Sequence, residues 1–252
     1  MRSEGEDSAV ARWWKSRFGY RLLIEIAVMA SLLTLYRLGR YLGRNQVDVA
    51  FQHARDVIQV EDAMGIANER GFQALVLDNL TFIRFMNRYY AMVHFPATVA
   101  FLAVVYVRTP DLYKRIRTIF IGVTGVGLVM QIAYPLAPPR MLSGFVDTVA
   151  TYGPTIYEKP GVESFANQYA AMPSLHVGWA LIVAWGALQL SSGRWRWWGV
   201  GHAIMTTLAV VVTANHYWAD AIVALALVAV VVWLQAGRRW STHREAIATS
   251  YP

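Results

Sequence analysis

Two residues in the stretch "NHYWADAIVA", His216 and Asp220, have types and a spacing that suit nucleophilic or acid–base chemistry. Residues four apart share one face of a helix, so the carboxylate can reach one nitrogen of the imidazole. That contact fixes the tautomer of the ring and leaves the other nitrogen available as a nucleophile or a base. The alternative for the pair alone is a structural polar contact at the end of a membrane span.

A second histidine, His176, lies in "AAMPSLHVGW", directly before a long apolar run. Pro173 suits the first turn of a helix, and Ser174 beside it can cap that turn. The unpaired amides of such a helix start, those around Ser174 and Leu175, attract an anion. His176 within this turn is placed to donate a proton to an oxygen of the bound anion.

A fixed cation completes the set, because Arg140 in "YPLAPPRML" follows two prolines that stiffen its backbone. Its guanidinium matches a phosphate group in a bidentate fork. Together these parts predict a phosphoryl-transfer site with a cage, a nucleophile and a general acid, and with no metal or cofactor. The alternative is a zinc or iron site formed by His176, His216 and Asp220. The arginine and the helix start favour an anion over a cation.

The composition indicates which elements position these residues. Of the 252 residues, 56% are hydrophobic and only 15% are charged, which is too apolar for a soluble domain and indicates a bilayer. The chain has no cysteine, which excludes disulfides and thiolate chemistry. Continuous apolar runs predict helices rather than a barrel. Six runs are long enough to cross about 30 Å of hydrocarbon, namely residues 20–38, 89–107, 116–135, 174–190, 197–213 and 217–236.

The predicted fold is therefore all-α, a polytopic membrane helical bundle with about six transmembrane helices and additional interfacial helices. The interfacial helices are expected at residues 47–62 and 71–88, where apolar and polar residues alternate with helical spacing. We expect residues 1–19 and 239–252 to be cytoplasmic tails and residues 20–238 to be a single transmembrane catalytic domain.

The net charge of +7 is interpreted as a topology signal rather than as a nucleic-acid footprint. Most of the 23 Lys and Arg residues fall on the side of the membrane that holds both termini, which the positive-inside rule assigns to the cytoplasm. Arg140, His176 and His216 then all lie at the opposite, extracytoplasmic face. In "NRYYAMVH", Tyr90 and His94 lie near the start of the second span, where His94 is either a packing residue or a member of the site.

The three motifs, in this order and spacing, resemble the type 2 phosphatidic acid phosphatase superfamily of membrane enzymes, and within it the branch containing fungal inositol phosphorylceramide synthase. The similarity of layout runs from about Glu61 to Ala236. The resemblance implies a six-span core with the site at one membrane face. It also implies that His216 attacks phosphorus to form a phosphohistidine, with Asp220 orienting the ring.

The resemblance assigns the remaining roles as well. His176 protonates the leaving oxygen, and Arg140 and the amides around Ser174 hold the phosphoryl oxygens. Water or an alcohol then releases the phosphoryl group from the enzyme.

The chain departs from the pattern of this superfamily at three positions. Leu175 replaces a usual glycine, Val210 replaces an arginine, and Ala133 replaces a lysine. Two phosphate-binding cations are thus missing, which favours the phosphotransferase-like branch. Four residues are candidate replacement donors, namely Lys159, Gln168, Tyr169 and Asn215.

The sequence thus predicts a metal-independent phosphoesterase or phosphotransferase in the plasma or inner membrane, acting on a lipid-linked phosphate or pyrophosphate. Its expected partners are this substrate, membrane lipids and, as acceptor, water, a polyol such as inositol, or a glycan. The alternative is a non-catalytic lipid-binding or transport protein that retains the fold. The presence of His176, His216 and Asp220 together argues against that alternative.

Overall fold

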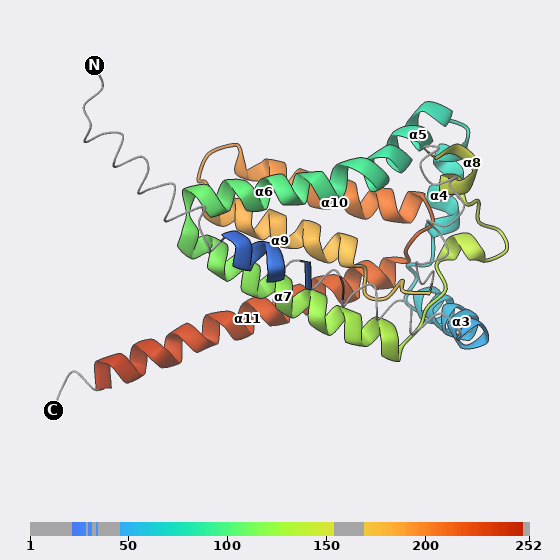
Figure 1. Ribbon diagram of the computed structural model, residues 1–252. Coiled ribbons are helices and arrows are strands. Elements are labelled where there is room, and N and C mark those ends of the chain that lie inside the picture. Colours follow the sequence, from blue (N-terminus) through green and yellow to red (C-terminus); the bar gives the residue numbers. More distant parts are fainter. Residues whose placement is uncertain (1–21, 29, 32–33, 35–45, 154–168, 249–252) are drawn as a thin grey trace, which may run out of the picture. The chain divides into compact units, whose positions relative to one another are not determined.

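The computed structural model describes residues 22–28, 30–31, 34, 46–153 and 169–248, with side chains as far as Gly237 in the last helix (Figure 1). The chain divides into two units, Met1–Leu38 and Gly39–Pro252. The described residues of the first unit are helical, and 9 of the 19 residues of the span expected at 20–38 lie outside them. The site lies in the second unit.

Long apolar helices dominate the described part of the second unit. Three are long and apolar enough to cross a membrane, over Leu80–Arg108, Pro110–Ala133 and Trp218–Gly237, and a shorter apolar helix covers Leu175–Leu190. Among the described residues there is no strand, only an isolated bridge between Leu136 and Ala170. The predicted all-α membrane bundle is confirmed.

Five of the predicted spans correspond to helices of the structure. Most of the predicted boundaries lie within one or two residues of a helix end. The helices of the bundle are α6 (His94–Arg108), α7 (Pro110–Ala133), α9 (Leu175–Leu190), α10 (Arg196–Val212) and α11 (Trp218–Ala248). Helix α6 is preceded without a break by α5 (Leu80–Arg88) and a π-helical turn, η2 (Tyr89–Val93). Apolar runs of sufficient length fix these helices, since backbone groups in lipid must be bonded within the segment.

Short helices gather at one end of the bundle (Figure 1). They are α3 (Val47–Ala63), α4 (Glu69–Leu77), η3 (Pro139–Met141) and α8 (Thr148–Tyr152). The single helix predicted over residues 71–88 is wrong, because it is broken into α4 and α5. Asn79 caps the start of α5 through its Oδ1, which accepts a hydrogen bond of 3.0 Å from the amide of Phe82.

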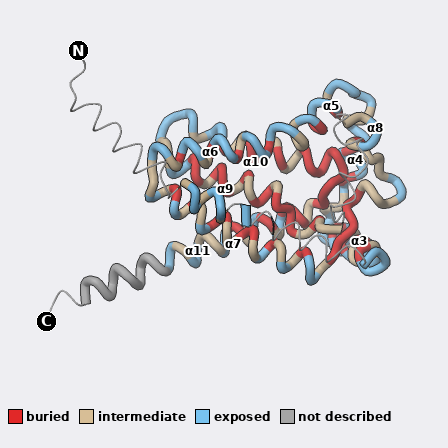
Figure 2. The backbone as a smooth tube through the Cα atoms, in the orientation of Figure 1, coloured by how far each residue is buried: buried red, intermediate tan, exposed pale blue. Residues whose placement is uncertain are grey.

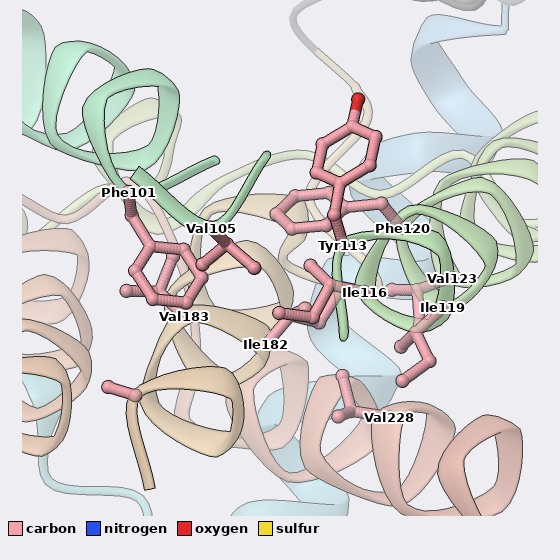
Figure 3. Close-up of a cluster of buried hydrophobic side chains, with 11 residues drawn as sticks. Phe101, Val105, Tyr113, Ile116, Ile119, Phe120, Val123, Ile182, Val183 and Val228 are labelled. Carbon is pink, nitrogen blue, oxygen red and sulfur yellow. The ribbon is translucent and has the colours of Figure 1, made fainter. Parts of the chain in front are cut away.

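Helices α6, α7, α9 and α11 pack around one apolar cluster, in which Phe101 and Val105 meet Ile116, Ile182 and Val228 (Figure 3). The buried residues follow the faces along which helices meet (Figure 2). Large apolar side chains are also exposed on the outside of these helices, including Val129 and Trp233 at 66% and 72%. An apolar exterior of this kind fits contact with lipid.

Helices α9 and α10 approach each other closely at Gly199. A Cβ atom there would lie 2.7 Å from Cβ of Ala187 and 3.1 Å from the carbonyl oxygen of Val183. Only a residue without a side chain fits this distance, so the antiparallel pair that ends in the site is held tightly at its other end.

Candidate active site

His216 and Asp220 lie where α10 ends and α11 begins. His216 Nδ1 lies 3.0 Å from Asp220 Oδ2, and the same oxygen accepts a hydrogen bond of 3.0 Å from the amide of Tyr217. Asp220 is completely buried and His216 nearly so. A carboxylate that accepts the Nδ1 proton leaves a lone pair on Nε2 of the ring.

A sharp turn after α10 delivers His216 to this place. Ala214 has φ = 54°, and the amides of Asn215 and His216 both donate to the carbonyl oxygen of Val210, at 2.9 and 3.1 Å. A left-handed conformation costs a non-glycine residue about 1 kcal/mol or more. The carbonyl of Ala214 accepts a bond of 2.8 Å from the amide of Arg140, which holds the turn in place.

His176 lies in the first turn of α9. Ser174 is the N-cap, and its Oγ accepts a bond of 3.3 Å from the amide of Val177. The expectation that Pro173 occupies the first helical turn is wrong: it precedes the cap, and its carbonyl accepts 3.0 Å from Gln131 Nε2. The ring centroids of His176 and His216 lie 6.0 Å apart.

Arg140 is part of the short helix η3 and lies beside the histidine turn. Its Nη1 donates to Asn215 Oδ1 at 2.6 Å, and its Nε lies 3.4 Å from Asp147 Oδ2. The side-chain Nδ2 of Asn215 donates in turn to Thr213 Oγ1 at 2.8 Å. Asn215, expected as a replacement phosphate donor, therefore orients the arginine instead.

Main-chain hydrogen bonds join the three segments that carry these residues. The amide of Arg140 bonds to Ala214, as above, and the amide of Ser174 donates 3.3 Å to the carbonyl of Asp220. The structure thus brings together at one end of the bundle the residues that the sequence placed there, namely Arg140, Ser174, Leu175, His176, His216 and Asp220. Leu175 contributes its backbone only, since its side chain is buried against α7.

The positions at which cations are missing are explained in part by packing. Val210 is completely buried in an apolar cluster with Val177 and Ala224, where an arginine has no room to remain solvated. Among the other expected donors, Tyr169 packs edge-on against Phe51, at 6.3 Å between ring centroids. Lys159 and Gln168 lie outside the described residues.

Aromatic rings of η2 and α6 lie beside the ring of His176. The ring centroids of Tyr90 and His94 lie 4.8 and 5.2 Å from that of His176. Tyr90 is in the π-helical turn η2, a feature often found at functional sites. His94 is 2% exposed and stacks on His202, 5.4 Å away, so it lies beside the site but on its inner side.

The alternative metal site is not assembled. In the parts of the chain that the structure describes, no group of three or more His, Asp or Glu side chains could hold a metal ion.

Two glutamates that the sequence analysis did not assign reach the same turn. Glu69 Oε1 accepts a bond of 3.0 Å from the amide of Trp218, and Glu61 Oε1 accepts one of 2.6 Å from the amide of Ala219. Both side chains are buried. Glu61 continues the buried face of α3 formed by Ala50, Ala54 and Val57, but its partner is on the distant helix α11, which the sequence does not reveal.

An apolar groove of about 420 Å³ includes in its lining two residues close in sequence to the site histidines. Side chains of α4, α9, α10 and α11 line it, among them Phe72, Val177, Leu181, Trp218 and Leu225. Val177 follows His176, and Trp218 is two residues from His216. From Trp218 to Leu225 the groove follows α11 for about 10 Å, at 1.5 Å per residue.

A helical membrane bundle that collects an arginine, two histidines and an aspartate at one end defines a membrane protein suited to anion chemistry. A family model described as the PAP2 superfamily matches residues 55–234, and the chain belongs to this superfamily. This membership supports a phosphatase-type phosphoesterase. No curated protein and no solved structure matches the chain.

Proposed function

We propose that the protein is a metal-independent membrane phosphoesterase or phosphotransferase that acts on a lipid-linked phosphate through a phosphohistidine at His216. The observation that carries this proposal is the 3.0 Å contact between His216 Nδ1 and the buried Asp220, with the ring of His176 beside it. Asp220 fixes the tautomer in which Nε2 carries the lone pair and stabilises the ring once it is positively charged. Nε2 is then the nucleophile.

In the first step, a bond forms between His216 Nε2 and phosphorus, and the bond from phosphorus to the leaving oxygen breaks. His176 gives a proton to that oxygen. In the second step, the oxygen of an acceptor attacks phosphorus, His176 takes the acceptor's proton, and the phosphorus–nitrogen bond breaks. Arg140 and the amides at the start of α9 bind the other phosphoryl oxygens.

The apolar groove supports a lipid substrate. Its lining includes Val177 and Trp218, which lie one and two residues from the two histidines in the sequence, and extends along α9 and α11 with apolar side chains. Its volume lies in the range of ligand pockets, and its lining suits a hydrocarbon chain. A substrate with its phosphate at His216 can therefore place part of its chain in the groove.

The positive-inside rule supports a site on the extracytoplasmic face of the plasma or inner membrane. The replacement of two family cations by Ala133 and Val210 supports a phosphotransferase like the branch that contains inositol phosphorylceramide synthase. For this protein the proposed acceptor is then an alcohol such as inositol. Hydrolysis and transfer share the first step and differ only in the second.

A lipid panel tests the proposal. The purified protein in detergent with EDTA is offered phosphatidate, a polyprenyl pyrophosphate and phosphoinositide-type lipids, with and without inositol. Phosphate release that ignores inositol identifies a hydrolase, and a product lipid that needs inositol identifies a transferase. Activity that EDTA abolishes contradicts the metal-independent mechanism, and no turnover of any lipid favours a non-catalytic protein.

Filling the groove is expected to impair long-chain substrates selectively. Leu225→Trp places an indole in the groove and displaces roughly two methylene groups of a bound chain, at about 0.8 kcal/mol each. We expect KM for a long-chain lipid phosphate to rise about tenfold, with little change for a water-soluble short-chain ester. Steady-state kinetics on both substrates measure this difference.

Leu234→Trp is the matched control, because Leu225 and Leu234 belong to the same helix and are 54% and 53% exposed. Leu234 is not part of the groove lining. An equal rise in KM for both variants, or for both substrates, would show that the groove does not hold the chain.

A further inference from the structure

The start of α11 is held by side chains from α3 and α4, the two helices that precede the long helix over Leu80–Arg108. The first amides of a helix have no partner within the helix. In α11, Glu69 from the first residue of α4 accepts from the amide of Trp218 at 3.0 Å, and Glu61 from the last turn of α3 accepts from the amide of Ala219 at 2.6 Å. Asp220, in this same turn, binds His216.

The burial of the two glutamates is unusual for helices of this kind. Glu61 is 0% and Glu69 4% exposed, although charged groups are rarely buried without compensation. The main chain also joins Glu61 to the turn before α4, because its carbonyl accepts from the amides of Ile66 and Ala67 at 2.9 and 3.3 Å. Both carboxylates are thus positioned by α3, α4 and the hydrogen-bonded turn between them, and both bind the start of α11.

One proton explains how two carboxylates share this place. Glu61 and Glu69 accept from consecutive amides of α11, so two buried carboxyl groups lie beside the same turn, where a proton on one of them reduces their repulsion. Glu61 Oε2 is buried and has no hydrogen-bond partner among the described residues, and burial of this kind favours the neutral carboxyl over the charged carboxylate. Burial, the bond to Glu69 and the charges of Glu69 and Asp220 raise the pKa of Glu61 from 4.5 to about 8.

We propose that Glu61 and Glu69 are positioning residues that fix the first turn of α11 and thereby hold Asp220 against His216. The inference rests on the proposed function, in which His216 is the nucleophile. It gives the helices α3 and α4 a role in the chemistry, since the bonds to Trp218 and Ala219 set the direction in which α11 starts.

The arrangement has a consequence for pH. Glu61 keeps its proton below about pH 8, and above it two ionised carboxylates face each other and Asp220, with Tyr217 as the neighbouring titratable group. The hydrogen bonds from the two glutamates to the first turn of α11 then weaken, so activity falls on the alkaline side. The sign for stability follows from the same shift: between pH 4.5 and about 8 only the folded state retains this proton, so the free energy of unfolding falls as pH rises through that window.

The decisive variant is Glu61→Gln, whose amide copies the protonated carboxyl. Its Oε1 accepts from Ala219 and its Nε2 donates to Glu69, but it cannot ionise. We expect it to retain most of its turnover at pH 7. The ratio of wild-type to variant kcat, which cancels titrations common to both, is expected to fall through about pH 8. A ratio that does not change with pH would overturn the inference.

Glu61→Leu removes the acceptor and is expected to lower kcat about 10²-fold with little change in KM, as for a small displacement of a catalytic group. Amide hydrogen exchange at Trp218 and Ala219 is expected to become faster in this variant and to stay slow in Glu61→Gln. Asp62→Asn, which removes a charge from the exposed neighbour on α3, is the matched control and should behave as wild type.

Unchanged kcat and unchanged exchange in Glu61→Leu would also overturn the inference. His216→Ala separates this failure from failure of the proposed function. If His216→Ala is as active as wild type, the proposed function is wrong. Exchange at Trp218 and Ala219 needs no turnover, so it still tests whether Glu61 holds this turn.

Discussion

Replacing His216 by alanine is expected to reduce phosphoryl transfer on the order of 10⁵-fold, to the background of the assay. The variant loses the only atom proposed to bond to phosphorus, and Asp220 is left buried without the imidazole it binds at 3.0 Å. Arg140 and the helix start remain, so substrate binding is expected to persist. The measurement is single-turnover kinetics with radiolabelled lipid phosphate, together with trapping of the labelled protein.

The trapping step distinguishes a nucleophile from a general base. A phosphohistidine is labile in acid and stable in base, so the wild-type label is expected to show this profile and the variant none. Asp220→Asn is the companion variant, because its amide would favour the wrong tautomer of His216. A label of equal yield in His216→Ala would contradict the proposed mechanism.

The second large effect is expected from His176→Gln, and its size should depend on the substrate. His176 is proposed to protonate the leaving oxygen, and general acid catalysis contributes about 10² to 10⁴-fold. We expect a loss of this size for a lipid phosphate, whose alcohol leaves poorly without a proton. For a nitrophenyl phosphate, whose oxygen leaves as a stable anion, the loss should be tenfold or less.

A series of aryl phosphates with leaving groups of graded acidity measures this dependence directly. In the wild-type protein, the rate of the first step should depend weakly on leaving-group acidity, and in the variant strongly. Parallel dependences in both proteins would show that His176 acts through packing against Tyr90 and His94 rather than as an acid.

The fold was largely predictable, because length and continuity of apolar runs determine membrane helices. The spans predicted at 174–190 and 197–213 differ from α9 and α10 by no more than one residue at each end. The break between α4 and α5 was missed. The apolar spacing continues across it, while the cap at Asn79 is a local feature that periodicity does not detect.

The candidate site was predictable where local chemistry and topology agree. The spacing predicted the contact of His216 with Asp220, although His216 lies in the turn before α11 rather than on the helix itself. Counting spans places Arg140 and His176 at the same end. The role of Asn215 was not predictable, since its bond to Arg140 joins segments 75 positions apart. Glu61 lies on the apolar face of its helix with Ala54 and Val57, so its burial could have been predicted, but its bond to Ala219 joins segments 158 positions apart and could not.

The main-chain bonds at the site have a consequence for how this site can evolve. The amide of Arg140 bonds to the carbonyl of Ala214, and that of Ser174 to the carbonyl of Asp220. Backbone groups are the same in every residue but proline, so these bonds survive most changes of side chain. Residue types around the phosphate can therefore drift while the three segments keep their positions. New substrate preferences can then arise by single substitutions that leave the positions of the backbone segments unchanged.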